Sequence, residues 1–378
     1  MLKKTFKTEV KLNQDQSSKF FNTWGVCRYV YNQFIEVNKT NYENGGETPY
    51  MSGYTFSKWL NENIGDRTWI KEVSSKSVKD SIMNADRAYK NFMRGSKGFP
   101  KFKSKYKDRP SMYFTSNGKL QPIEVERHRV KIPTLGWVHI NEKNYIPTGD
   151  HSGMGTLVHE AGRFYISVTI DMPKVIDDRP YTEGVGIDLG VQTLAVVSNG
   201  DVYENMNKSN NVKKLKKKIK RAQRNLSRKL KNKKKGSNLS NNAKKDILKL
   251  QKAHRDYTNF KKDYINKMVN KITVRTKPEF IVMENLAISN MVKNRHLSRV
   301  ISDSNFYEIK TKIKIKSENL GIRFIEADRF YPSSKTCSVC GEHKPDLKLK
   351  NRVFVCSNGH EINRDLNAAL NLRNLGTV

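Results

Sequence analysis

Three acidic residues that lie far apart in the sequence place the strongest constraint on the fold of this chain. Each has a distinct local setting: Asp188 in Gly184-Val-Gly-Ile-Asp-Leu-Gly-Val191, Glu284 in Phe280-Ile-Val-Met-Glu284, and Asp365 in Asn363-Arg-Asp-Leu-Asn-Ala-Ala-Leu-Asn371. The first two runs are typical of buried strands, and the third is typical of a helix start. A fold that satisfies all three settings needs a sheet and a helix from three distant parts of the chain.

The strand that carries Asp188 has two different faces. Alternate side chains share a face, so Val185, Ile187, Leu189 and Val191 would face a core and Asp188 would face the other way. Glycines 186 and 190 flank Asp188 on its own face, and we expect them to leave room for a metal ion and a phosphate.

Together, the three carboxylates would form a cage of hard oxygen ligands suited to Mg²⁺ or Mn²⁺. Two such ions about 4 Å apart can activate a water and stabilise the departing oxygen of a phosphodiester. Taken singly, Asp365 could cap its helix, Glu284 could be a solvated strand end, and Asp188 could bond to turn amides. Taken together, the set favours a metal site.

The charge of the chain points to a polyanionic partner. It has 71 Lys and Arg against 37 Asp and Glu, a formal net charge of +34 over 378 residues. Self-repulsion of this size destabilises a compact protein unless a polyanion binds it, and nucleic acid is the leading candidate. A membrane surface is the alternative, but no apolar run is long enough to span a bilayer. The N-terminal residues alternate like a strand and lack the apolar centre of a signal peptide, so we expect a cytoplasmic protein, associated with the nucleoid when bound to DNA.

Three of the four cysteines cluster near the C-terminus. Cys337-Ser-Val-Cys340-Gly is followed by Cys356-Ser-Asn-Gly-His360. Two facing turns of this kind can supply a tetrahedral Zn²⁺ site that holds together an insert without a core of its own. The fourth ligand is then His360, with His343 as the alternative, and a zinc-free turn with spare thiols remains possible. Cys27, on an apolar helical face, reads as buried packing.

The periodicity predicts a mixed α and β chain with a dense basic segment. We expect helices over 14–39, 57–92, 212–233, 243–272 and 305–319, and strands at 185–197, 280–284, 322–327 and several places between 112 and 171. Between Lys213 and Lys235, 14 of 23 residues are Lys or Arg, and an apolar stripe leaves them on the exposed face. We expect six of them to bind nucleic-acid backbone: Lys213, Lys217, Lys220, Arg221, Arg224 and Arg228.

With these features in place, the chain resembles the TnpB family, the transposon-encoded RNA-guided nucleases related to compact type V CRISPR effectors. The resemblance covers nearly the whole length and rests on these runs: Arg28-Tyr-Val-Tyr-Asn32, Gly98-Phe-Pro-Lys-Phe-Lys103, Ile132-Pro-Thr-Leu-Gly136, Gly186-Ile-Asp-Leu-Gly190, Glu284-Asn-Leu286, Pro332-Ser-Ser-Lys-Thr-Cys-Ser-Val-Cys-Gly341 and Arg364-Asp-Leu-Asn-Ala-Ala369.

The resemblance implies an α/β plus α+β multidomain protein. It implies an RNase H-like (RuvC) nuclease domain over 181–330 and 361–378, with Asp188, Glu284 and Asp365 as catalytic ligands of two Mg²⁺ or Mn²⁺ ions. A zinc-ribbon-like insert would occupy 331–360. A split β-barrel (wedge) domain over 1–13 and 106–180 would surround a helical recognition domain over 14–105.

The resemblance also implies the partners. One chain would bind a guide RNA derived from the transposon end and cut double-stranded DNA beside a short target-adjacent motif, with base pairing choosing the sequence. Loose analogy assigns the reading of that motif to Tyr54, Lys76, Asp80, Thr115, Ser116 and Asn117. From its position, Arg364 is a candidate contact to the scissile phosphate.

The chain departs from the family pattern at two places. A second Cys-x-x-Cys is replaced here by Cys356 to His360, and an aspartate is often found where this chain has Asn363. The alternatives to an RNA-guided nuclease are a nuclease-silent, RNA-guided DNA-binding regulator and a guide-free, structure-specific nuclease. Loss of an acidic ligand would mark the regulator, and the long basic N-terminal half argues against the guide-free enzyme.

Overall fold

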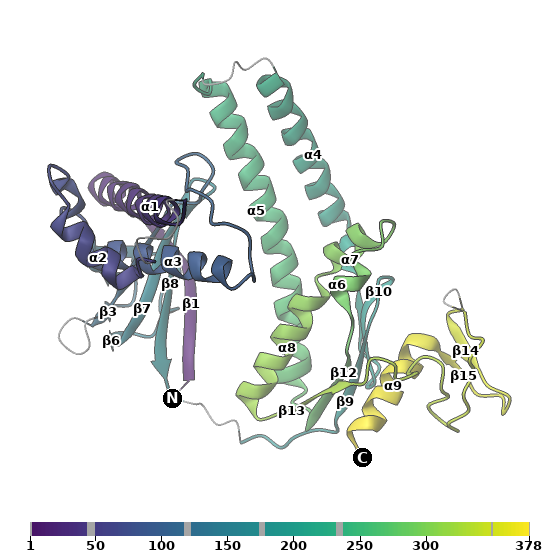
Figure 1. Ribbon diagram of the computed structural model, residues 1–378. Helices are drawn as coiled ribbons and strands as arrows, with labels where there is room; N and C mark the ends of the chain where they lie inside the picture. The colour runs from purple at the N-terminus through teal and green to yellow at the C-terminus, as the bar shows by residue number, and fades with distance from the viewer. Residues whose placement is uncertain are drawn as a thin grey trace. The chain divides into compact units, whose positions relative to one another are not determined.

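The computed structural model describes residues 2–43, 50–116, 122–173, 178–231, 237–348 and 351–377, which divide into two compact units (Figure 1). The first unit spans 1–174 and the second 175–378. No helix in the described ranges combines the length and apolar character that crossing a bilayer requires.

The N-terminal unit is built on one eight-stranded sheet with the order β2-β7-β8-β1-β5-β4-β3-β6. Its strands are β1 (Leu2–Lys11), β2 (Ser111–Thr115), β3 (Ile123–Val125), β4 (Arg129–Ile132), β5 (Gly136–Ile140), β6 (Gly149–His151), β7 (Gly153–Glu160) and β8 (Arg163–Met172). The first strand of the chain therefore lies inside the sheet, between β8 and β5. Alternation along β8 places Ile166, Val168 and Ile170 in the core of this sheet, within the range where the sequence predicts strands.

Helices α1 (Gln14–Glu43), α2 (Gly53–Glu62) and α3 (Ser75–Met93) lie between β1 and β2 in the chain. They share a core of their own, which includes Phe34, Phe56 and Ile82. The expected helix over 57–92 is divided in two, because the Ser52 and Ser74 side chains each accept a backbone N–H and cap a separate helix start. The short 3₁₀ helix η1 (Thr68–Ile70) lies between them.

The C-terminal unit has a five-stranded sheet with the order β11-β10-β9-β12-β13. Its strands are β9 (Val185–Leu189), β10 (Thr193–Val197), β11 (Val202–Glu204), β12 (Phe280–Glu284) and β13 (Arg323–Ala327). Strands β9, β12 and β13 are parallel, β10 pairs antiparallel with β9, and β11 pairs antiparallel with β10. The expected strand over 185–197 is thus two strands, since the chain turns back after Gly190 and pairs Leu189 with Ala195.

Helices cover both faces of this sheet. On one face, Val185 and Ile187 of β9 share a core with α5 (Asn241–Asn270) and α8 (Phe306–Leu320). On the other face, α9 (Arg364–Gly376) packs against β12 through Leu372, Phe280 and Val282. The remaining short elements of this unit are η2 (Met206–Lys208), the π-helical turn η3 (Lys271–Arg275), α6 (Ile288–Met291), α7 (Ser298–Ser304), β14 (Val353–Val355) and β15 (Glu361–Asn363).

Helices α4 (Asn210–Lys231) and α5 form a long antiparallel pair that extends away from the sheet (Figure 1). The α4 residues of the predicted stripe are Leu215, Ile219, Ala222, Leu226 and Leu230. The first four are partly buried, and Leu230 is exposed. Residues 232 and 233 of the expected helix lie outside the described ranges. Ion pairs Lys229–Asp246 at 2.5 Å and Lys218–Asp256 at 3.3 Å join the two helices.

Candidate functional site

The fold places all three predicted carboxylates on the α9 face of the C-terminal sheet. Asp188 lies two residues after Gly186 on β9, and Glu284 lies two residues after Val282 on β12, so both share the face on which α9 packs. The parallel register pairs Met283 with Ile187, which puts Glu284 beside Asp188 on strands about 4.8 Å apart. Asp365 lies in the first turn of α9 itself.

Gly186 makes room for helix α9 and not for a metal ion. A Cβ atom at this position would lie 2.0 Å from the carbonyl oxygen of Ala369 and 2.4 Å from the backbone nitrogen of Arg373. The space is therefore filled by α9, and the expectation that it admits a metal ion and a phosphate was wrong. The glycine instead allows α9, which carries Asp365, to lie directly against the backbone of β9.

Negative charge outweighs positive charge around Asp188. Burial raises the pKa of Asp188 well above its usual value, and the charges of Glu284 and Asp365 raise that pKa further. Arg364 acts in the opposite direction. A carboxylate beside two like charges is unfavourable without a cation and favourable around a divalent one, so the chemistry of these donors suits the metal site that the sequence predicts.

Asp365 is not the residue that caps α9. The helix cap is Asn363, whose Oδ1 accepts from the backbone N–H of Asp365 at 3.0 Å and of Leu366 at 3.2 Å. Asparagine caps a helix about as well as aspartate does, so this departure from the family pattern keeps the helix start and adds no further negative charge. The Asp365 carboxylate has a guanidinium nitrogen of Arg352 at 3.9 Å, and Arg364 donates to Ser334 Oγ at 3.2 Å.

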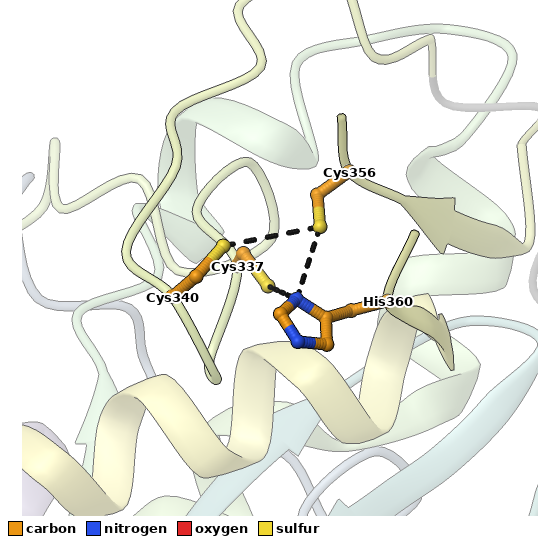
Figure 2. Close-up of side chains that lie close together, drawn as sticks. All are labelled: Cys337, Cys340, Cys356 and His360. Carbon is orange, nitrogen blue, oxygen red and sulfur yellow. Dashed lines mark hydrogen bonds between the residues drawn. The ribbon is translucent and has the colours of Figure 1, made fainter. Parts of the chain in front are cut away.

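Figure 2 shows the second candidate metal centre, where Cys337, Cys340, Cys356 and His360 point toward one another. Their ligand atoms all lie within 4.8 Å of each other. The Cys340 and Cys356 sulfurs are 3.8 Å apart, and His360 Nδ1 lies 3.1 Å from the Cys356 sulfur and 3.8 Å from the Cys337 sulfur. Tetrahedral zinc with Zn–S bonds of about 2.3 Å needs sulfurs about 3.8 Å apart, so this group fits zinc.

The two turns that present these ligands are built alike. Gly341, directly after Cys340, and Gly359, between Cys356 and His360, have φ values of 75° and 78°, which favour glycine. Glu342 joins the turns, because its Oε2 accepts from the backbone N–H and the hydroxyl of Ser357 at 2.9 and 2.5 Å. Of the two histidines that the sequence offers as fourth ligand, the structure brings His360 into the group, while His343 lies beside Thr336.

The basic residues singled out on α4 are all exposed: Lys213, Lys217, Lys220, Arg221, Arg224 and Arg228. Helix α4 therefore presents a row of cations on the side away from α5, while Lys216 and Lys218 are used in ion pairs with Asp303 and Asp256.

In the N-terminal unit, three of the predicted motif-reading residues come together. The Lys76 ammonium on α3 lies 3.4 Å from the carbonyl oxygens of Thr115 and Ser116 at the end of β2. Asp80 accepts from Asn84 at 2.8 Å, and burial raises its pKa. Tyr54 is 67% exposed under Lys79, and Asn117 lies outside the described residues.

Sequence reasoning missed three buried polar residues near the carboxylate site of the C-terminal unit: Ser333, Asn367 and Asn371. All three lie in the runs 332–341 and 363–371, but the sequence assigns no role to them. The spacing of the two asparagines, four residues apart on a helix, was the available signal, because it places both side chains on one face of α9.

Three protein-family models match the chain. One described as "Probable transposase" matches residues 167–295, one described as "Cas12f1-like, TNB domain" matches 306–372, and one described as "Helix-turn-helix domain" matches 1–47. Residues 2–43 form a strand and one long helix, so the third description does not name the local structure found here.

Two curated relatives align along almost the whole chain. The "Putative RNA-guided DNA endonuclease InsQ" of Escherichia coli K12 is 29% identical, covering 97% of this chain and 90% of its own length. A "Putative RNA-guided DNA endonuclease" of Streptomyces pristinaespiralis is 27% identical, covering 98% and 89%. Among solved structures, the Cas12f1 chain of a Cas12f1-sgRNA-target DNA complex matches with a TM-score of 0.60 and 17% identity, covering 96% of this chain and 83% of that one, which shows a shared fold.

Proposed function

The chain belongs to the TnpB family, and from this premise we propose that it is a metal-dependent DNA endonuclease directed by a guide RNA. The proposed substrate is double-stranded DNA beside a short target-adjacent motif, cut by a single RuvC-like site. The observation that carries the proposal is the meeting of Asp188, Glu284 and Asp365 on one face of a sheet, with burial and like charge raising the pKa of Asp188.

In this proposal the three carboxylates hold divalent ions, Mg²⁺ or Mn²⁺. When bound, two such ions activate a water and stabilise the leaving oxygen of the phosphodiester. Asp188 and Glu284 fix the ligand geometry from adjacent strands, and Asp365 completes it from α9. Arg364 precedes Asp365, and we assign to it a contact with the scissile phosphate, for which its planar guanidinium is suited.

The strand order of the C-terminal unit supports an RNase H-like assignment. Three parallel strands, β9, β12 and β13, are extended on the β9 side by β10 and β11, each antiparallel to the strand before it, and helices cover both faces. We assign the nuclease domain to 181–330 and 361–378 and the zinc-ribbon-like insert to 331–360. In the N-terminal unit, the sheet that includes β1 is assigned to the split wedge domain and α1 to α3 to the recognition domain.

The zinc of the insert has a structural role in this proposal. The insert buries little apolar surface, with a core of Cys337, Leu347, Phe354 and Cys356 and a contribution from Ile362. Four protein ligands leave no open coordination position, and such closed sites contribute folding energy rather than catalysis. The chain therefore uses two kinds of metal site, one for chemistry and one for structure.

The basic face of α4 is proposed to bind the backbone of the guide RNA or of the paired strand. Replacing Lys220, Arg221, Arg224 and Arg228 together with glutamine should weaken nucleic-acid binding and reduce the slope of log affinity against log salt by up to about 3. The measurement is a salt titration of complex formation. The matched control exchanges Lys for Arg and Arg for Lys at the same four positions, and it should keep the slope. An unchanged slope in the glutamine variant would remove α4 from the interface.

The guided function is tested by purifying the protein from its native locus and sequencing the RNA that accompanies it. We expect one discrete species, with a structured body and a variable end that matches the flank of the element. That RNA defines a DNA target, and cleavage of this target in Mg²⁺ distinguishes a nuclease from a nuclease-silent regulator. If only bulk nucleic acid of no defined sequence is recovered, the guide-free nuclease becomes the better explanation.

A further inference from the structure

A buried serine contacts one of the three carboxylates. Ser333 Oγ donates a hydrogen bond to Glu284 Oε1 at 2.5 Å, and Ser333 is only 2% exposed. Ser333 lies near the start of the zinc-ribbon-like insert, in the segment that follows β13, and not on either element that carries the other two acidic residues. We propose that Ser333 is a positioning residue that fixes the Glu284 carboxylate for metal binding, and that α9 holds Ser333 in place through Asn371. The inference rests on the proposed function of the carboxylate site.

Asn371 fixes the backbone around Ser333. Its Nδ2 donates to the carbonyl oxygen of Ser333 at 2.7 Å and to that of Thr336 at 2.6 Å, and Asn371 is 4% exposed. The Tyr331 hydroxyl donates in turn to the carbonyl oxygen of Asn371 at 3.3 Å. Buried amide donors of this kind are costly to leave without partners, so the segment around Ser333 has little freedom to move away from α9.

A second asparagine extends this attachment by one helical turn. Asn367 is fully buried, and its Nδ2 donates to the carbonyl oxygen of Thr336 at 2.7 Å. The backbone N–H of Ser338 donates to Asn367 Oδ1 at 2.8 Å. The segment 333–338, which ends just after the zinc ligand Cys337, is therefore bound to one face of α9 along its length.

These contacts join two acidic residues that come from different elements. Asp365 lies in the first turn of α9, and Glu284 ends β12. The path from Glu284 through Ser333 and Asn371 returns to α9 and so sets the distance between the two carboxylates before any cation binds. Like charges would otherwise turn the Glu284 side chain away from Asp188 and Asp365.

The chemistry of serine suits this purpose. An ionised carboxylate has two oxygens with about four acceptor positions, and a single hydroxyl donor occupies one of them. The remaining positions stay available to a divalent cation. A lysine or arginine in the same place would neutralise the carboxylate and compete with the cation for it, whereas the hydroxyl is neutral and orients without competing.

The test compares Ser333→Ala with Ser333→Thr and with a matched control in the protein purified with its guide RNA. The control is Ser317→Ala on α8, because Ser317 is equally buried in the same unit and its hydroxyl has no hydrogen-bond partner among the described residues. Two quantities are measured: Mn²⁺ binding by electron paramagnetic resonance without DNA, and the Mg²⁺ concentration that gives half-maximal cleavage.

We expect Ser333→Ala to weaken Mn²⁺ binding and raise the half-maximal Mg²⁺ concentration by about 10- to 100-fold, the range found when an outer partner of a metal ligand is removed. Binding of target DNA in the absence of divalent ions should stay at the wild-type level. Ser333→Thr keeps the hydroxyl and should recover most of the loss, and Ser317→Ala should behave as wild type.

Mn²⁺ binding by Ser333→Ala within about twofold of wild type would overturn the inference, since the hydroxyl would then only fill space. An equal loss in the alanine and threonine variants would also overturn it, because packing rather than the hydrogen bond would be responsible. Failure of the proposed function looks different: the wild-type complex would then not cut its target, while the comparison of Mn²⁺ binding among the variants would still decide the role of Ser333.

Discussion

Replacing Asp188 with asparagine is expected to abolish cleavage of guided DNA targets while leaving guide and target binding intact. Asparagine keeps the shape of the side chain but removes the charge that a divalent ion needs, and Asp188 is the carboxylate whose pKa the charges of Glu284 and Asp365 raise. Metal-ion catalysis supplies several kcal/mol of transition-state stabilisation, so the rate should fall by about 10³-fold or more. The measurement is single-turnover cleavage of a matched target in Mg²⁺, with binding followed separately.

The control for this variant is Asp263→Asn on α5, an exposed carboxylate of the same unit that pairs with Lys267 at 2.8 Å. A surface pair of this kind contributes little, so the control should cleave at the wild-type rate. Cleavage by Asp188→Asn within about tenfold of wild type would show that the metal ions bind elsewhere.

The same residue should make the stability of the metal-free protein depend on pH. Burial, together with Glu284 and Asp365, raises the folded-state pKa of Asp188 above its ordinary value of 3.8. The native state therefore holds this proton more tightly than the unfolded chain does, and the associated stability is present at low pH and is lost as the pH rises through the raised pKa. In chelator, the unfolding temperature of Asp188→Asn should exceed that of wild type by an amount that grows with pH. A difference that is constant from acid to alkaline pH would contradict this explanation.

Replacing Cys356 with alanine should have the second large effect, the loss of zinc and of ordered structure in the insert. Cys356 contacts both Cys340 and His360 and is buried in the small core that also holds Phe354. Zinc binding in small domains contributes on the order of 10 kcal/mol to folding, and so little apolar core cannot replace it. Zinc content should fall from about one ion per chain to none, with rapid hydrogen exchange over residues 331–363, which span the insert and β15.

The two histidines of the insert provide the matched comparison. His360→Ala should lose zinc as Cys356→Ala does, while His343→Ala should keep it, because only His360 lies in the ligand group. Retention of one zinc by Cys356→Ala would mean that the cysteines are spare thiols. Since Cys337 lies in the segment that Asn367 and Asn371 bind to α9, zinc loss should also slow cleavage.

Much of the candidate site was predictable because its residues have strong local signals. An acidic residue that ends an apolar strand, as Glu284 does, must emerge at the rim of a sheet, and the run around Asp365 begins a helix. The Cys-x-x-Cys spacing of Cys337 and Cys340 predicts a ligand-bearing turn by itself. Charge density on 213–235 predicts an exposed basic helix without knowledge of its partners.

Other features had no such signal, since they depend on what packs against a residue. The role of Gly186 could not be inferred from β9, because its space is taken by a helix that begins 178 residues later in the sequence, at Arg364. The strand expected over 185–197 is two strands, β9 and β10, because the chain turns back after Gly190 and the two halves pair with each other. The choice of His360 over His343 depended on which turn faces the Cys337 turn in space.

The sequence alone determined which chemical groups this protein has: three carboxylates, a cysteine cluster, a basic helix and the strands and helices that carry them. These follow from periodicity, turn chemistry and charge, which act over a few residues. Only the tertiary structure decided how the groups meet. The parallel register of β9 and β12, the close packing of α9 on Gly186 and the attachment of Ser333 to Glu284 join residues that lie 49 or more positions apart in the sequence. Such contacts arise from packing of buried surfaces and satisfaction of buried polar groups, and no local pattern encodes them.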